Sequence, residues 1–345
     1  MHIRSLTRSR WPVLAGLLLT VWTSLAASAA PALRVEGDHF TVDGHPRFLV
    51  LVSYFDAMRA SDATLDTDFE YFRSVGVDGI RVFPNWWNCA DMTHFPDDTL
   101  MDATGAIRPD RLARLKPVLD KASSMGFIVD LSFAFETVGG LSALTESQLG
   151  HSQAELPVNQ VHADAYERGL TETARALRAY RNVFFDIQNE FNGRITHLSD
   201  DEVKRFLAAI KAVDPGRIVT ASLANEIGPE DVVARSVRLG LDIVAWHESR
   251  NPWQYDAMDQ LVQRAKQAGR IPIYLGEPAS MEQDLGAEEF LTAITKAKSA
   301  GAAAWTFHTE SGFDLRRAGL TAQLTENEKR FLDTFKAKLN EAPSP

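Results

Sequence analysis

The chain has 345 residues, of which 45% are hydrophobic and 24% are charged, and its formal net charge is −10. Such a composition is typical of a globular protein with enough apolar residues to bury a core. The excess of acidic residues disfavours nucleic acids and anionic polymers as partners, because these bind to basic grooves, whereas neutral glycans remain compatible with it.

The first 29 residues have the features of a secretory signal peptide. Three arginines precede the apolar stretch 13–25, and an Ala-Ser-Ala sequence at 27–29 offers a cleavage site. The apolar stretch contains polar residues and is short for a membrane-spanning helix, which needs about 20 residues. We therefore expect residues 1–29 to be removed, leaving residues 30–345 as a secreted or periplasmic protein without a stable membrane anchor. Loss of the three arginines changes the net charge to −13.

A short stretch near the start of the mature chain predicts a β-hairpin. Residues 33–42 are expected to form it, with Asp43 and Gly44 as a turn. Asp-Gly is a favoured hairpin sequence, because both turn positions adopt positive φ. We expect this hairpin to close the floor of the domain that follows.

One pattern then repeats along the chain: a short apolar run, a turn and an amphipathic helix. Apolar runs rich in β-branched and aromatic residues, bounded by helical segments, are typical of buried parallel strands. The expected strands are 48–55, 79–83, 127–135, 183–187, 218–222, 243–246, 271–275 and 302–307. The helices expected after them are 65–75, 110–125, 163–180, 200–213, 229–239, 254–268, 287–300 and 326–339. Eight strand–helix units without a linker predict an α/β fold, a single (β/α)8 or TIM barrel.

Two glutamates end apolar runs in this pattern. Glu190 ends the sequence Val-Phe-Phe-Asp-Ile-Gln-Asn-Glu, and Glu277 ends Ile-Pro-Ile-Tyr-Leu-Gly-Glu. In a TIM barrel the active site lies at the carboxyl ends of the strands, so both carboxylates are expected there. Two carboxylates are the minimum for cleaving a glycosidic bond, one as proton donor and the other as nucleophile or base.

Other strand ends carry aromatic, basic and acidic side chains. Aromatic faces stack on the C–H faces of sugars, and polar groups hydrogen-bond to sugar hydroxyls, so these residues predict a sugar-binding cleft. The predicted substrate-binding residues are Tyr54, Arg81, Trp86, Trp87, Glu136, Asn189, His247, Trp305 and His308.

On these residues the chain resembles the retaining glycosidases built on (β/α)8 barrels, most closely the cellulase-like family 5. The resemblance covers residues 33–339. The family ends strand four with an Asn-Glu pair whose glutamate is the acid/base, and ends strand seven with a nucleophilic glutamate. The resemblance therefore implies that Glu190 is the acid/base and Glu277 the nucleophile, with Asn189 beside the acid/base.

The resemblance extends to three further positions. The family arginine that ends strand two and supports the nucleophile matches Arg81. The strand-six histidine matches His247, and the strand-eight tryptophan matches Trp305. Together with the glutamate pair, these matches imply a retaining hydrolase that needs no cofactor or metal.

The chain also departs from the family pattern at two positions. The family commonly has a histidine at the end of strand three, where this chain has Phe133 and Phe135. A tyrosine commonly follows the strand-six histidine by two residues and touches the nucleophile, but Ser249 stands there. Tyr54 or Tyr255 is a candidate to take its place. These departures bear on the subfamily and the substrate more than on the chemistry.

The resemblance implies different protonation states for the two carboxylates. Glu277 is expected to stay ionised because Arg81 lies nearby, since a cation favours the charged form. Glu190 must carry a proton near neutral pH, which desolvation and the charge of Glu277 favour. The carboxyl groups are expected to lie about 5–5.5 Å apart, and Asn189 to hydrogen-bond the sugar 2-hydroxyl. The expected substrate is a neutral β-linked oligo- or polysaccharide of glucan or mannan type.

Two other readings remain open. A metal-dependent barrel hydrolase is possible because His247, Glu248, His308 and Glu310 are potential ligands, although such barrels usually carry a His-x-His pair on strand one, which is absent here. A non-catalytic carbohydrate-binding barrel is the other alternative. Binding alone does not require both glutamates, so their presence argues against it.

Overall fold

The computed structural model of the protein describes residues 31–85, 99–102, 104–134, 156–157, 160–192, 196–224, 228–247, 252–278 and 286–341. The predicted signal peptide lies outside these residues, and so do three predicted site residues, Trp86, Trp87 and Glu136. No helix within the described ranges combines the length and the apolarity that are needed to cross a membrane.

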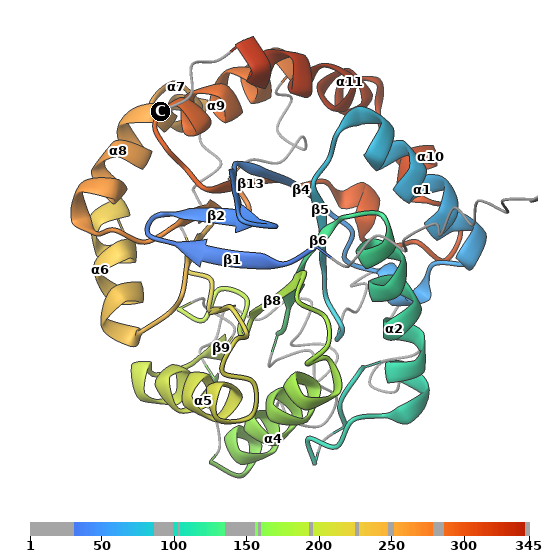
Figure 1. Cartoon of the computed structure of the whole chain (residues 1–345), viewed down its shortest axis with the longest axis vertical. Helices are drawn as coiled ribbons and strands as arrows, with labels where there is room; N and C mark the ends of the chain where they lie inside the picture. Colours follow the sequence, from blue (N-terminus) through green and yellow to red (C-terminus); the bar gives the residue numbers. More distant parts are fainter. Residues whose placement is uncertain are drawn as a thin grey trace, which may run out of the picture.

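Eight parallel strands form a barrel inside a ring of helices (Figure 1). Around the barrel the strands are β10 (Val219–Thr220), β8 (Val183–Asp186), β6 (Ile128–Ser132), β5 (Gly79–Val82), β4 (Leu49–Ser53), β13 (Ala304–Phe307), β12 (Ile273–Leu275) and β11 (Val244–Trp246). A parallel bridge between Leu223, which follows β10, and Trp246 of β11 closes the ring. The structure thus confirms the predicted (β/α)8 barrel.

The barrel strands are separated in sequence by amphipathic helices. These are α1 (Asp62–Val75), α2 (Pro109–Ser124), α4 (Gln160–Ala176), α5 (Asp200–Val213), α6 (Pro229–Leu239), α8 (Met258–Ala268), α9 (Ala287–Ser299) and α11 (Glu326–Glu341). α5 illustrates why they form: its buried residues Val203, Phe206, Leu207 and Ile210 recur at the spacing of one helix face. A capping box between Ser199 and Glu202 satisfies backbone N–H groups at its start.

Shorter elements lie between these units. They are the 3-10 helices η1 (Ala57–Arg59) and η4 (Glu310–Gly312), the helices α7 (Pro252–Asp256) and α10 (Leu320–Gln323), and the strands β7 (Leu156–Pro157) and β9 (Thr196–His197). β7 and β9 pair with each other outside the barrel.

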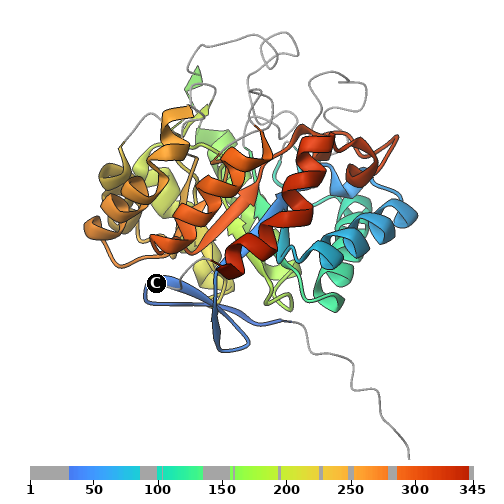
Figure 2. The same ribbon diagram turned by 90° about the horizontal axis from the view of Figure 1, so that it is seen from above.

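A small antiparallel sheet covers one end of the barrel (Figure 2). It consists of β1 (Leu33–Glu36), β2 (His39–Val42) and β3 (His45–Arg47). The predicted hairpin is confirmed, but the Asp43-Gly44 turn leads into a third strand that the sequence did not predict, because all three of its residues are exposed. Asp43 and Gly44 have φ values of 53° and 81°, as such a turn requires.

The inner face of the barrel changes character from floor to rim, because alternate residues of a strand point inward. Near the small sheet the inward residues are apolar and pack with Phe40 of β2. They include Leu49, Leu51, Ile128 and Phe184. Further along the same strands, the buried residues Arg81, Asp130 and Asp186 carry charge. The strands therefore build an apolar floor beneath a charged layer, which lies next to the strand ends that carry the two glutamates.

Candidate active site

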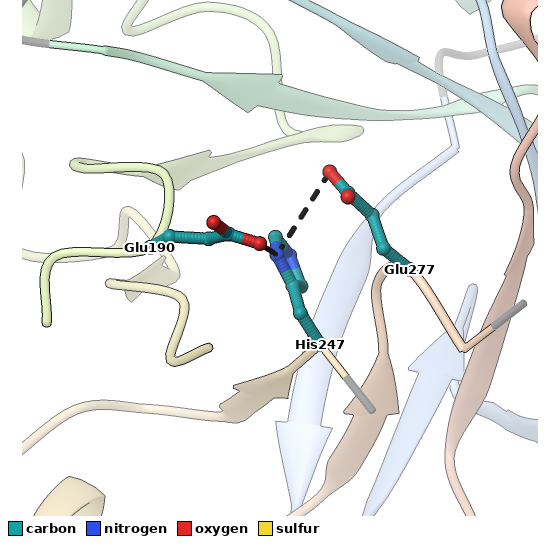
Figure 3. Close-up of side chains that lie close together, drawn as sticks. All are labelled: Glu190, His247 and Glu277. Atoms are coloured by element: carbon teal, nitrogen blue, oxygen red, sulfur yellow. Dashed lines mark hydrogen bonds and ion pairs between the residues drawn. The ribbon is translucent and has the colours of Figure 1, made fainter. Parts of the chain in front are cut away.

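The two predicted carboxylates meet at the carboxyl ends of the strands (Figure 3). Glu190 follows β8 and Glu277 follows β12, and His247, after β11, lies between them. One carboxylate oxygen of each glutamate and one ring nitrogen of His247 all lie within 4.8 Å of one another. The barrel thus brings together three side chains that are far apart in sequence.

A buried arginine holds Glu277. Arg81 on β5 has no exposed surface, and its Nη1 donates a hydrogen bond to Glu277 Oε1. Its Nη2 donates to Asn189 Oδ1 at 2.8 Å, so the same guanidinium orients the Asn-Glu pair. The rings of Phe55 and Phe83 lie 5.3 and 5.0 Å from the guanidinium carbon, within range of cation–π attraction. A guanidinium in this position favours the ionised form of Glu277.

Two buried aspartates also face Arg81, and the sequence reading did not predict them. Asp130 Oδ2 lies 3.2 Å from Arg81 Nε, and Asp186 Oδ2 lies 3.5 Å from Nη2. Burial raises the pKa of both aspartates, and Arg81 opposes the rise. Burial lowers the pKa of Arg81 itself, but its carboxylate neighbours, led by Glu277, raise it above its ordinary value.

A further buried group ties this charged layer together. The Tyr274 hydroxyl donates to Asp130 Oδ2 at 2.8 Å and lies 2.6 Å from Thr306 Oγ1. Ser132 Oγ accepts from Arg81 Nε at 2.9 Å and donates to Asp130 Oδ1 at 3.0 Å. One cation is thus shared by three carboxylates inside a hydrogen-bonded network. The sequence does carry a signal for this layer. Asp130 and Asp186 each lie within an apolar run, at a strand position that points into the barrel.

Glu190 has surroundings unlike those of Glu277. Its side chain is 38% exposed, compared with 10% for Glu277. His247 Nδ1 lies 3.0 Å from Glu190 Oε1 and 3.8 Å from Glu277 Oε1. The backbone of Glu190 has a φ of 49°, and its N–H donates to the hydroxyl of Ser222 at 2.9 Å. One carboxylate is therefore held by a buried cation, and the other reaches solvent beside a histidine.

Two other predicted site residues are buried close to the strand ends. Trp305 lies in β13 and has no exposed surface. His308 follows β13, and its ring packs against Phe55 at 5.6 Å and Phe313 at 5.7 Å between centroids. Phe55 in turn contacts Arg81, so His308 borders the aromatic group around the guanidinium. The role of Trp305 as a sugar platform stays a prediction.

Tyr54 packs against α1 and Tyr255 against α9, and neither of these contacts involves Glu277, the expected nucleophile. The Tyr54 hydroxyl donates to Asp68 of α1 at 2.8 Å, and its ring packs in the layer between barrel and helices. The expectation for Tyr54 needs correction because neighbouring strand residues alternate: Ser53 points inward, so Tyr54 points outward. Tyr255 of α7 stacks on Phe290 of α9, with ring centroids 6.0 Å apart. Ser249, like Trp86, Trp87 and Glu136, lies outside the described residues.

The metal-site hypothesis names His247, Glu248, His308 and Glu310 as ligands. Glu248 lies outside the described residues, and within them no group with metal-like spacing contains His308 or Glu310. Among the described residues, Glu190, His247 and Glu277 form the one group with spacing that suits a metal. Arg81 already donates to the Glu277 oxygen that faces His247. The carboxylate charge is therefore balanced by a guanidinium, and the donor set fits an ion-paired nucleophile better than a metal ligand.

Solved structures that share this barrel over most of the chain include family 5 glycoside hydrolases. A GH5_18 enzyme variant from Streptomyces cattleya, solved with Manβ1-4GlcNAc, has a TM-score of 0.61 at 18% identity over 87% of this chain and 83% of its own. The β-mannanase of the blue mussel Mytilus edulis has a TM-score of 0.58 at 17% identity over 90% of this chain and 97% of its own.

A putative glycoside hydrolase from Bacteroides vulgatus has a TM-score of 0.66 at 13% identity over 92% of this chain, which spans 62% of that protein. The sequence matches no known family model and no curated protein. At identities this low, structural similarity establishes the fold alone. The chemistry therefore has to be argued from the site itself.

Proposed function

We propose that the protein is a retaining β-glycoside hydrolase that cleaves a neutral β-linked oligo- or polysaccharide of glucan or mannan type. One observation carries the proposal: Glu190 and Glu277 face each other across a short gap in unequal surroundings. Retaining glycosidases hold their carboxyl groups about 5–5.5 Å apart, whereas inverting enzymes need about 6.5–9.5 Å to admit a water molecule. Oxygens within 4.8 Å of each other favour the retaining geometry.

In the first step Glu277 attacks the anomeric carbon of the sugar. Arg81 keeps this carboxylate ionised, and burial excludes water that would weaken it as a nucleophile. Glu190 gives its proton to the glycosidic oxygen, so the leaving group departs as a neutral alcohol. The product of this step is a covalent glycosyl ester on Glu277.

In the second step Glu190 acts as a base. It removes a proton from water, which attacks the anomeric carbon and releases Glu277 with the original configuration of the sugar. The 38% exposure of the Glu190 side chain suits this step, because the base must reach solvent. Asn189 accepts from Arg81 through Oδ1, which leaves its amide N–H groups to donate to the sugar 2-hydroxyl.

The similar structures suggest which sugar to test first. They include β-mannanases from Mytilus edulis, Rhizomucor miehei and Aplysia kurodai, and the GH5_18 variant solved with Manβ1-4GlcNAc. We therefore place β-mannosides ahead of β-glucosides in a substrate panel. The acidic overall charge is compatible with both, because neither substrate carries charge.

The test compares residues 30–345 as wild type, Glu190→Ala and Glu277→Ala on activated aryl β-glycosides. Both variants should lose most activity, whereas Glu289→Ala, an exposed glutamate of α9, should retain it. Azide should rescue Glu277→Ala to give the inverted glycosyl azide, and Glu190→Ala to give the retained one. Full activity of either variant would remove the assignment of that glutamate. A wild type that binds glycans without turnover would support the non-catalytic alternative.

We also propose that the protein is exported and loses its first 29 residues. The arginines, the apolar stretch and the Ala-Ser-Ala sequence at 27–29 support this proposal. Expression of the full chain in a bacterial host, followed by N-terminal sequencing of the exported protein, tests it. A mature N-terminus at residue 30 is the expected result, and retention of an intact N-terminus in the membrane fraction would contradict it.

A further inference from the structure

Asp186 contacts a residue that supports each of the two carboxylates, Arg81 for Glu277 and Ser222 for Glu190. It is the last residue of β8 and is 1% exposed. Its Oδ1 accepts the backbone N–H of Ser222 at 2.8 Å. Its Oδ2 lies 3.5 Å from Arg81 Nη2 and 3.4 Å from Ser132 Oγ. Asp186 thus touches the arginine that holds Glu277 and, on its other side, the serine beside Glu190.

Ser222 holds the backbone of Glu190 in an unfavourable conformation. Its hydroxyl accepts the N–H of Glu190 at 2.9 Å, and its carbonyl accepts the N–H of Phe191 at 3.0 Å. A φ of 49° is uncommon for a residue with a side chain and persists only where its surroundings enforce it. Ser222 is fully buried, so water does not compete for these contacts.

We propose that Asp186 and Ser222 are positioning residues that join the two catalytic glutamates through one buried chain of contacts, Glu277–Arg81–Asp186–Ser222–Glu190. The inference rests on the proposed function, because the two glutamates need roles before their placement matters. Ser222 sets the direction in which Glu190 presents its carboxyl group. Asp186 places a negative charge next to Arg81, which holds Glu277, and it accepts a hydrogen bond from the backbone N–H of Ser222.

The two positioning residues act on different properties of the site. Ser222 carries no charge, so its loss changes geometry and the delivery of a proton by Glu190. Asp186 competes with Glu277 for Arg81, so its charge weakens the hold of the guanidinium on the nucleophile. Among the described residues, the other ionisable groups that face this network are Asp130 on β6, His247 after β11 and Tyr274 on β12.

The variant Ser222→Ala tests the geometric half of the inference. A substrate with a poor leaving group, such as a phenyl β-glycoside, needs the proton of Glu190, but a 2,4-dinitrophenyl β-glycoside does not. We expect kcat/KM to fall about tenfold or more for the former, since general acid catalysis contributes about 10²–10⁴-fold in total, and to change much less for the latter. A general structural defect would lower both values alike.

Thr220→Val is the matched control for this variant. Thr220 lies on β10, two residues before Ser222, and its buried hydroxyl donates to the Ile243 carbonyl at 2.9 Å without contact to either glutamate. This variant also loses a buried hydroxyl, two residues away from Ser222, so its kcat/KM should keep the wild-type ratio between the two substrates. Equal losses for both substrates in Ser222→Ala would overturn the role of Ser222.

The variant Asp186→Asn tests the electrostatic half. Asparagine keeps an oxygen for the N–H of Ser222 but removes a negative charge next to Arg81. Loss of that charge favours the ionised form of Glu277, because Arg81 then has one fewer carboxylate to balance. The acidic limb of the pH profile of kcat/KM should therefore move to lower pH, by about half a unit or more. Asp68→Asn, at a buried aspartate that binds Tyr54 and the helix layer, should leave the profile unchanged.

A measurement without turnover separates this inference from the proposed function. Carboxyl ¹³C NMR follows the titration of Glu277 in wild type and Asp186→Asn, after circular dichroism confirms that the variant is folded. If the wild type hydrolyses no glycoside but the Glu277 titration shifts, the linkage stands and the proposed function fails. If the wild type is active and neither this titration nor the pH profile responds, the role of Asp186 is refuted.

Discussion

The floor and the upper layer of the barrel interior are built by the same strands but bury opposite kinds of side chain. At the floor Phe40 of the small sheet packs on Phe184, with ring centroids 6.1 Å apart. In the upper layer Arg81 faces Asp130 and Asp186 with no exposed surface. Apolar burial stabilises the fold, whereas burial of charge costs desolvation energy that the ion pairs only partly offset. The residues that stabilise this barrel and the residues placed for chemistry therefore lie at different levels along the same strands.

The largest effect is expected for Arg81→Met. This change leaves three carboxylates in the upper layer without their shared cation, so we expect kcat/KM to fall at least about 10³-fold and the free energy of unfolding to fall by about 3–5 kcal/mol. Enzyme kinetics and urea denaturation measure the two losses.

Arg217→Met is the matched control, at a second buried arginine that lies outside the charged layer. Arg217 is also buried, and it binds Asp214 and the carbonyl oxygens of Leu177 and Val183. Its loss should lower the free energy of unfolding but leave kcat of the folded protein within about twofold of wild type, because no contact links it to the glutamates. A comparable loss of kcat in both variants would contradict the separation of the layers.

Phe40→Ala should give the converse result. Removing this ring opens a cavity between the small sheet and the barrel, and the free energy of unfolding should fall by about 3–5 kcal/mol. Because the charged layer does not contact Phe40, kcat and the pH profile should stay at their wild-type values. Thermal unfolding, read together with kinetics below the melting transition, checks both statements. A shifted pH profile would show that the floor also tunes the site.

Asp56, which follows β4 near the rim, should make stability depend on pH. Burial raises its pKa to about 6, although Arg59 opposes the rise. An unfolded aspartate titrates near about 3.9, so the folded state binds this proton more tightly. The stability that protonated Asp56 contributes is present below about pH 4 and is lost as the pH rises through about 6, a change of up to about 3 kcal/mol.

Urea denaturation of wild type and Asp56→Asn between pH 4 and pH 7 tests this expectation. The difference in unfolding free energy between the two proteins should grow in favour of the variant as the pH rises. Asp62→Asn, at an exposed carboxylate of α1, should follow the wild type at every pH. A difference between Asp56→Asn and wild type that does not vary with pH would contradict the raised pKa.

The smallest effect is expected for Gly276→Ala. An added Cβ would lie 2.9 Å from His247 Nε2 and 3.0 Å from Cδ2, so the buried ring has to shift relative to Glu190. We expect kcat to fall about tenfold with little change in unfolding free energy. Gly228→Ala is the control, because a Cβ there meets nothing closer than 3.6 Å. Wild-type kcat in Gly276→Ala would mean that the position of His247 is unimportant.

Much of the barrel could be predicted from the sequence, because each of its units carries a local signal. Apolar strands bounded by amphipathic helices predicted the fold, and the Asp43-Gly44 turn was correctly placed. β3 was missed because its residues are exposed and show no alternation. Its formation depends on pairing with β2, which is a tertiary interaction rather than a local preference.

The candidate site was predicted unevenly for a related reason. Glu190 and Glu277 stand out because they follow apolar runs, and the structure brings them together. Asp130 and Asp186 were not predicted because each lies inside such a run, where only the alternation of inward and outward residues marks a side chain as facing the barrel interior. Tyr54 was wrongly predicted to reach the site for the same reason. It follows the inward-pointing Ser53, so its side chain points to the helix layer. Strand alternation is therefore the signal that would have sharpened the prediction.

The seam between β10 and β11 has a consequence for motion. Other neighbouring strands share at least two consecutive residue pairs, but here a single bridge, Leu223 to Trp246, closes the ring. Segments with few backbone contacts open first in sub-global fluctuations, so amide hydrogens along this seam should exchange with deuterium earliest among those of the barrel. Ser222 borders one side of the seam and His247 the other. Such an opening would separate Ser222 and His247, the two neighbours of Glu190, from each other.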